Sequence, residues 1–264
     1  MPEPTSAELA AKRDEVVHGH LDTYASTLAV LSEIPVDDWE RPTGCPGWSV
    51  RSVISHMIGI ERFMLGDPFP ELRLDPVPDH VTTEFGAFTE VDVAVRADHD
   101  PDRLLAEATE VFARRREAVE ALSPEDMGTV IRGAFGEGAA IKVLGTRLFD
   151  LWAHEQDIRR AVGRPGHLQG PAADLFWKRA TRGLQRGLAG RVDGLGEVSI
   201  AIGQPEERAI SFTVGEGTTV GLATDLSNFV ALTCGRDDAQ SGAVGIEGDP
   251  DLGARVLASM AITP

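Results

Sequence analysis

Apolar side chains recur every three or four positions in several segments of the first 190 residues, which is the spacing of one face of an α-helix. The first helix is predicted over residues 6–31, where the apolar residues at this spacing are Leu9, Val16, Val17, Leu21, Tyr24, Leu28 and Leu31. Further along the chain the same spacing predicts helices over residues 49–65, 102–122, 141–162 and 171–188.

Helix-start signals accompany this pattern. Ser49 has the chemistry of an N-cap for the second helix, and Pro101 stands at the start of the third. Two stretches interrupt the helical spacing: residues 66–100 are rich in Pro, Asp and Gly, and residues 123–140 contain several glycines. Both stretches are predicted to be connections.

The pattern changes after Gly190. Short β-branched alternations with glycine at their ends predict strands over residues 197–203, 208–215, 218–224 and 243–249, and helices over residues 225–236 and 250–262. Helices followed by a block of strands indicate an α+β protein of two domains. We expect residues 1–190 to form a helical bundle and residues 191–264 to form a small α+β domain with an antiparallel sheet and helices.

Composition narrows the classes of function. The 264 residues carry a formal net charge of -17, which argues against a nucleic-acid partner and against docking on an anionic membrane. The N-terminus is too polar for a signal peptide, so none is expected. No apolar run is long enough to span a membrane, so no membrane span is expected either. Cys45 and Cys234 are the only cysteines, so no disulfide framework is expected and a cytoplasmic location is predicted. Neither is expected to be a nucleophile, because the loop around Cys45 offers no paired base.

Candidate chemistry lies on two helices. Asp150, His154 and Asp157 are spaced i, i+4 and i+7, so they share one stripe of the helix predicted over residues 141–162. This polar stripe lies beside an apolar stripe of the same helix, so its side chains also face the core. On the second helix His56 also points inward, because it shares its face with Val53, Ile60 and Phe63.

Two inward histidines and one carboxylate form a ligand set for catalytic zinc or non-haem iron. Asp157 is then suited to supporting the ligands without binding the metal, because it could accept a hydrogen bond from the other ring N–H of a ligating histidine. The residues alone leave open whether these histidines bind a metal or are satisfied core residues, since "HEQD" is not the HExxH zinc signature. His20 lies on the core face of the first helix, where packing is favoured over a ligand or substrate-contact role.

Two stretches resemble a known family of metalloenzymes. "DDWERPTGCPGWSVRSVISHMIG" and "FDLWAHEQDIRRAVGRP" are similar to the histidine-bearing motifs of DinB-like proteins related to mycothiol-dependent maleylpyruvate isomerase. The C-terminal stretch "CGR…GIEGDPDLGARVLASMAITP" resembles the family's small sterol-carrier-like domain. The resemblance implies a DinB-like up-down four-helix bundle followed by that domain.

The resemblance also implies site residues and cofactors. His56, Asp150 and His154 would be the metal ligands, although the family usually has Glu where Asp150 stands. Arg236 would match a functional arginine of the C-terminal domain. The implied cofactors are a divalent metal, with zinc ahead of iron or nickel, and the thiol mycothiol.

The implied activity is addition of a metal-activated thiol to a small electrophilic substrate, giving isomerisation or thiol transfer. The partners would then be a small-molecule substrate and a low-molecular-weight thiol. Two alternatives stay open at this point. One is a divergent enzyme that uses the metal as a Lewis acid in a biosynthetic pathway without mycothiol, and the other is a non-catalytic metal-binding or stress protein.

Overall fold

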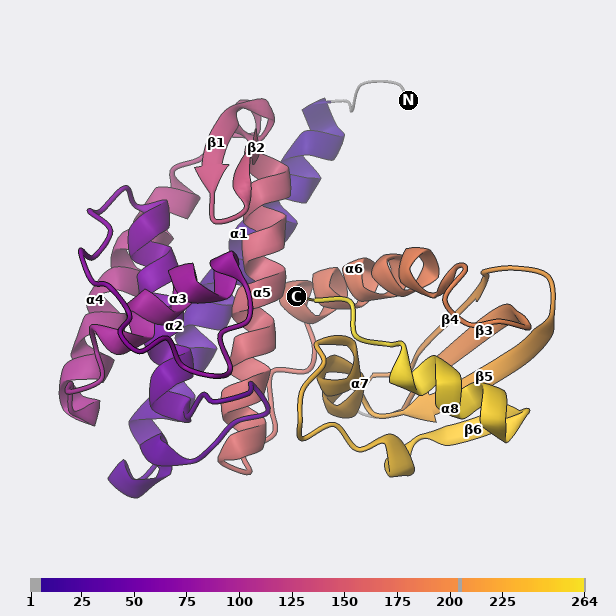
Figure 1. The fold of residues 1–264 in the computed structure, drawn as a ribbon. Coiled ribbons are helices and arrows are strands. Elements are labelled where there is room, and N and C mark those ends of the chain that lie inside the picture. The colour runs from indigo at the N-terminus through magenta and orange to yellow at the C-terminus, as the bar shows by residue number, and fades with distance from the viewer. Residues whose placement is uncertain (1–5, 204–205, 264) are drawn as a thin grey trace. The chain divides into compact units, whose positions relative to one another are not determined.

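The structure, a computed structural model, describes residues 6–203 and 206–263, and the chain divides into two compact units (Figure 1). The first unit is Met1–Arg164 and the second is Pro165–Pro264. The sequence pattern placed the boundary at residue 190, whereas the contacts place it before helix α6 (Pro171–Leu188). Side-chain contacts explain the difference, because Trp177 of α6 packs against Phe229 with ring centroids 5.0 Å apart.

Four long helices form the bundle of the first unit. Helices α1 and α2 each pack against both α4 and α5, so the four helices enclose one core. The predicted helices are confirmed, with ends that differ by one or two residues from those expected. Their bounds are α1 Ser6–Glu33, α2 Val50–Met64, α4 Pro101–Glu120 and α5 Ala140–Ala161.

Side-chain caps fix where two of these helices begin. The hydroxyl of Ser49 accepts a hydrogen bond from the backbone N–H of Ser52 at 3.4 Å, as the sequence predicts for α2. Asp100 caps α4 by accepting from the N–H of Arg103 at 2.8 Å, and Pro101 occupies the first turn. A 3₁₀ helix, η1 (Val36–Glu40), lies between α1 and α2.

Helix α3 (Glu84–Ala94) lies within the stretch that was predicted to be a connection, and this prediction was wrong. Helix α3 packs on α2. Its buried positions include Glu90 and Asp92 next to Val91, so the apolar periodicity that marks a helix in a sequence is missing here.

A β-hairpin precedes α5, where the sequence was also predicted to be a connection, and this too is a correction. Strands β1 (Val130–Gly133) and β2 (Gly136–Ala139) pair in antiparallel register, with Gly133 opposite Gly136. The two residues between them are Ala134 and Phe135, which lack the Asn-Gly or Asp-Gly signal of a two-residue hairpin turn. Gly136 has a φ of 107°, a conformation that favours glycine. A short 3₁₀ helix, η2 (Glu125–Gly128), comes before the hairpin.

The bundle core combines apolar packing with a group of buried charges. Tyr24 stacks on Phe112 with ring centroids 4.8 Å apart. Glu61, Arg115 and Arg147 are also buried in this unit. Buried side chains that form the apolar cluster include Val53, Ile54, Met57, Leu104, Val111 and Leu151.

The second unit contains a four-stranded sheet in the order β4-β3-β5-β6. Its strands are β3 Leu195–Ile202, β4 Arg208–Thr213, β5 Thr218–Thr224 and β6 Gly245–Gly248. The sheet is mixed and not purely antiparallel, because β3 and β5 pair in parallel. The cause is the chain path: β4 turns back along one edge of β3, and β5 then returns along the other edge.

Helices accompany this sheet. Helix α7 (Leu226–Thr233) is capped by Asp225, as predicted, and α8 (Pro250–Ala258) packs against β5 and β6. A 3₁₀ helix, η3 (Ser241–Ala243), precedes β6. A helical bundle followed by a sheet with helices confirms the predicted α+β fold class. Among the described residues, every helix is too short or too polar to cross a lipid bilayer.

Candidate metal centre

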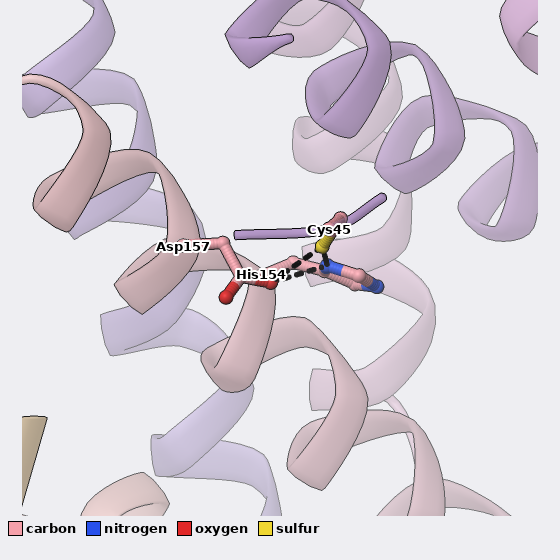
Figure 2. A group of neighbouring side chains, drawn as sticks. All are labelled: Cys45, His154 and Asp157. Carbon is pink, nitrogen blue, oxygen red and sulfur yellow. Dashed lines mark hydrogen bonds and ion pairs between the residues drawn. The ribbon is translucent and has the colours of Figure 1, made fainter. Parts of the chain in front are cut away.

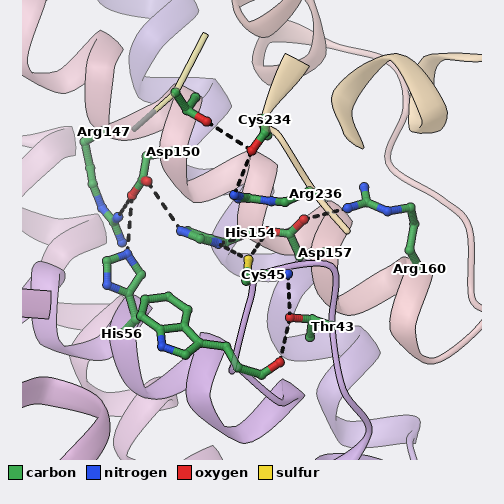
Figure 3. A network of polar contacts seen from close by, with 12 residues as sticks. Thr43, Cys45, His56, Arg147, Asp150, His154, Asp157, Arg160, Cys234 and Arg236 are labelled. Atoms are coloured by element: carbon green, nitrogen blue, oxygen red, sulfur yellow. Dashed lines mark hydrogen bonds and ion pairs between the residues drawn. The ribbon is translucent and has the colours of Figure 1, made fainter. Parts of the chain in front are cut away.

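Helices α2 and α5 bring His56, Asp150 and His154 together (Figure 3). One potential ligand atom from each residue lies within 4.8 Å of those of the other two. Nε2 of His154 is 3.4 Å from Oδ1 of Asp150, and Nε2 of His56 is 3.7 Å from Oδ2 of the same carboxylate. These are the three residues that the sequence analysis selected from two segments about a hundred residues apart.

His56 offers two buried nitrogen atoms that could act as donors to a ligand. Its side chain is 4% exposed, and within the described residues neither ring nitrogen has a hydrogen-bond partner. The 3.7 Å separation from Asp150 is too long for a hydrogen bond. Buried polar atoms are nearly always hydrogen-bonded, so these nitrogens call for a partner. Burial lowers the pKa of His56 to about 4, so the imidazole is neutral and has a lone pair to donate near neutral pH.

His154 is held from its other side by Asp157. Nδ1 of His154 lies 3.0 Å from Oδ2 of Asp157, which leaves Nε2 facing Asp150. Burial disfavours a charged His154, but the Asp150 carboxylate outweighs that effect and holds the pKa of His154 well above its usual value. A metal bound at Nε2 would therefore replace a proton there. Arg160 donates to Oδ1 of Asp157 at 2.6 Å and balances its charge.

Cys45 lies against the same residues (Figure 2). Its thiol donates to Oδ2 of Asp157 at 3.1 Å, and its sulfur is 3.9 Å from Nδ1 of His154. The expectation that the loop offers Cys45 no neighbouring base was wrong, because the loop folds back onto α5. Thr43 contributes to this turn by accepting from the N–H of Cys45 at 3.2 Å.

Cys45, His154 and Asp157 thus form a second group that has the donor atoms for a metal. The two groups share His154 but use different ring nitrogens. Within the second group, Nδ1 of His154 and Oδ2 of Asp157 already pair with each other at 3.0 Å, whereas both ring nitrogens of His56 lack a hydrogen-bond partner among the described residues. The donor chemistry therefore favours the group with His56, and the sequence analysis contained no signal for the long-range contact of Cys45.

A cavity of about 220 Å³ opens beside the first group. His56, Arg147 and Asp150 lie on one side of it, and apolar side chains of α2 such as Ile60 and Met64 lie nearby. The remaining lining comes from the first turns of α5 and from α3 and the β1–β2 hairpin, the two elements that the sequence analysis missed. Phe85 of α3 and Phe135 of the hairpin stack there with ring centroids 4.4 Å apart.

Two further residues from the sequence analysis have defined places. His20 is fully buried in α1, where its Nδ1 lies 2.8 Å from the carbonyl of Val16, and burial lowers its pKa to about 4. These contacts fit the packing role that the sequence favoured. Arg236 follows α7 in the second unit, and its Nη1 donates to the carbonyl of Cys234 at 3.1 Å. A catalytic role for Arg236 stays a prediction.

Comparisons with known proteins show the family and the fold of this chain. A family model described as the mycothiol maleylpyruvate isomerase N-terminal domain matches residues 21–159, a range that includes all three candidate ligands. An uncharacterized protein found in two strains of Mycobacterium tuberculosis is 26% identical over 162 residues. That match covers 61% of this chain and 58% of the relative, so it spans little more than half of the relative's length.

Solved structures show the same fold. Crystal structures of a mycothiol-dependent maleylpyruvate isomerase and of its histidine-to-alanine mutant are 17% and 16% identical to this chain, with TM-scores of 0.59 and 0.60. Each alignment covers 89% of this chain and 92% of the solved chain. On the strength of the family match over residues 21–159, the chain belongs to the mycothiol maleylpyruvate isomerase N-terminal domain family.

Proposed function

We propose that this protein is a metal-dependent enzyme that adds the thiol mycothiol to a small electrophilic substrate, giving isomerisation or thiol transfer. The observation that carries the proposal is the convergence of His56, Asp150 and His154 beside a cavity, with both ring nitrogens of His56 buried and unpartnered among the described residues. Family membership and the fold shared with the isomerase support the choice of thiol.

The residues fit a divalent ion. Two imidazoles and one carboxylate from the protein would leave open positions for a thiol, and zinc is the ion that such a set favours, with iron or nickel as alternatives. When bound, the ion supplies positive charge that lowers the pKa of a coordinated thiol. Asp157 would keep Nδ1 of His154 engaged, so that Nε2 stays available as the donor atom.

The cavity would hold the substrate next to that thiol. Its apolar side chains, which include Ile60 and Phe85, would contact the apolar part of a substrate. When bound, mycothiol would supply a thiolate that adds reversibly to an activated double bond, which permits isomerisation with no net change in atoms or electrons, or transfer of the thiol and its proton to the substrate. His56, Asp150 and His154 would hold the ion that keeps this thiol deprotonated, and the cavity beside them would hold the substrate.

Metal analysis of untagged protein, combined with activity assays, tests the proposal. We expect near-stoichiometric zinc or iron, and turnover of electrophilic substrates only when mycothiol is present. Metal-dependent turnover without any thiol would favour the divergent Lewis-acid enzyme. Metal without turnover of any substrate would favour a non-catalytic metal-binding protein. Protein that is folded but takes up no divalent ion would contradict the proposal.

A further inference from the structure

Arg147 contacts two carboxylates at once, Glu61 in the bundle core and Asp150 at the candidate metal centre, and Figure 3 shows the second contact. Its Nε donates to Oε1 of Glu61 at 2.6 Å, while its Nη1 donates to Oδ2 of Asp150. Its Nη2 lies 3.3 Å from the carbonyl of Met57 as a third acceptor. The Arg147 side chain is only 4% exposed, so these contacts are made almost entirely out of water.

Glu61 is fixed in turn from its other side. Its side chain is completely buried, and Oε2 accepts from Nε of Arg115 at 2.5 Å. Burial alone would raise the pKa of Glu61, but the charges of Arg147 and Arg115 outweigh it and lower the pKa to about 2. Glu61 is therefore an anion at every ordinary pH. The ion pairs run from Arg115 on α4 through Glu61 on α2 to Arg147 and Asp150 on α5.

This arrangement leaves the Arg147 guanidinium little freedom. The group is planar and its N–H donors have fixed directions, so occupation of Nε by Glu61 sets where Nη1 points. Rotation away from Glu61 would leave a buried charge without its partner, which is strongly unfavourable. Arg147 thus presents a donor to Asp150 in one fixed place.

A fixed donor restricts the orientation of the Asp150 carboxylate. Its side chain is 31% exposed toward the cavity, in contrast to the buried His56 and His154. A carboxylate with that much access to solvent would otherwise sample several orientations. With Oδ2 held by Arg147, Oδ1 faces Nε2 of His154 at 3.4 Å. The shorter aspartate is thereby kept within reach of both imidazoles.

We propose that Arg147 is a positioning residue, anchored by Glu61, that orients the Asp150 carboxylate for metal binding. The inference rests on the proposed function in one respect, namely that the ion binds between His56, Asp150 and His154. Two effects of Arg147 oppose each other, because its positive charge repels a cation while its hydrogen bond organises the ligand. We expect the second effect to dominate, since Glu61, which Arg147 shares with Arg115, offsets part of the charge of Arg147.

The direct test is the metal affinity of Arg147→Gln, measured by competition with a chromogenic chelator. We expect the dissociation constant to rise about 10–100-fold, the range found when partners of metal ligands are removed. The Co²⁺-substituted protein should also show a changed visible absorption spectrum, which reports the ligand geometry independently of activity. Arg114→Gln is the matched control, because Arg114 pairs with Asp67 on the outside of the same bundle. It should leave both readouts unchanged.

A double-mutant cycle protects the test from a folding artefact. Asp150→Glu lengthens the ligand, so the carboxylate reaches the ion with less help from Arg147. Adding Arg147→Gln to Asp150→Glu should therefore weaken metal binding much less than Arg147→Gln does alone. If Arg147→Gln is unfolded by circular dichroism, Arg147→Lys keeps a positive charge opposite Glu61 but loses the planar group that contacts Glu61 and Asp150 together, and it carries the same expectation of weaker binding.

Opposite outcomes separate this inference from the proposed function. Unchanged or tighter metal binding by folded Arg147→Gln, with an unaltered Co²⁺ spectrum, overturns the positioning role and leaves the proposed function standing. Equal losses in the Asp150 and Asp150→Glu backgrounds also overturn it. Parent protein that binds no divalent ion at all overturns both the proposed function and the inference.

Discussion

His154 and Asp157 lie one helical turn apart on α5, and Nδ1 of the histidine is 3.0 Å from Oδ2 of the aspartate. This contact leaves Nε2 of His154 as the nitrogen that faces Asp150. We expect Asp157→Asn to weaken metal binding about 10–100-fold, because the amide lacks the charge that fixes the ring. Metal content after dialysis, with circular dichroism to confirm folding, measures the effect. Full metal retention would mean that Asp157 does not support the centre.

The ligands themselves should show larger effects. His56→Ala and His154→Ala each remove one of the three donor groups, so either variant should lose most of its metal on dialysis while the helical signal remains. His18→Ala is the control, since His18 is an exposed histidine on α1. Asp150→Glu should retain metal at least as well as the parent. Folded histidine variants with full metal would place the centre elsewhere.

Neither thiol is expected to act as a nucleophile. Ser in place of Cys45 keeps a hydrogen-bond donor to Asp157, and the proposed mechanism takes its sulfur from mycothiol. The double variant Cys45→Ser/Cys234→Ser should therefore keep its metal and most of its activity. The measurement is turnover with mycothiol, after thermal unfolding has shown that the variant is folded. Loss of turnover in a folded, metal-loaded variant would contradict the expectation.

The hairpin turn should affect substrate binding but not metal binding. Phe135 is 62% exposed, stacks on Phe85 and forms part of the cavity wall. We expect Phe135→Ala to raise KM for the substrate while metal content stays constant. Val130→Ala, at an exposed position of the same hairpin away from the cavity lining, should change neither quantity. Equal kinetics for the two variants would exclude the hairpin from the substrate site.

A buried aspartate on α3 makes folding stability depend on pH. Asp92 is 2% exposed, and burial raises its pKa to about 6 despite the nearby Arg96. Because the folded-state pKa lies above the unfolded value, Asp92 contributes stability at low pH that is lost as the pH rises through about 6. Asp92→Asn should remove this dependence and raise the free energy of unfolding by up to about 3 kcal/mol at about pH 8.

Urea unfolding of the metal-free protein between about pH 4 and pH 8 measures this difference. Asp22→Asn, at an exposed position of α1, serves as the control and should follow the parent at every pH. Parallel pH profiles for the parent and Asp92→Asn would show that Asp92 does not titrate in this range.

The sequence predicted the long helices and the inward orientation of His56, Asp150 and His154 because both depend on helical periodicity, whereas the family resemblance implied that the three residues meet. Asp150, His154 and their apolar neighbours repeat with the helix, so their shared orientation follows from spacing alone. Helix α3 was missed because Glu90 and Asp92 occupy buried positions that would ordinarily be apolar. The hairpin was missed because its Ala134–Phe135 turn lacks the usual residues.

Contacts between distant segments could not be predicted from the sequence for a different reason. Strand alternation shows which face of a strand is buried but not the direction of its neighbour, so the parallel β3–β5 pair could not be anticipated. The pairing of Cys45 with Asp157 and of Glu61 with Arg147 depends on how α2, α5 and a loop meet in space. No local sequence pattern indicates these contacts.

The cavity wall has a consequence for how this protein can diverge. Under the proposed function, the metal ligands stand on the long helices α2 and α5, whereas much of the remaining cavity lining comes from the short β1–β2 hairpin and from Phe85 of α3. Gly133 and Gly136 are restricted positions, because a Cβ on Gly133 would lie 2.6 Å from Val143 and Gly136 has a φ of 107°. Phe135 and Gly138 are freer, so substitutions there can reshape the space available to a substrate without disturbing the bundle. Substrate range would then change at the hairpin while the metal ligands stay constant, and selection could alter one without the other.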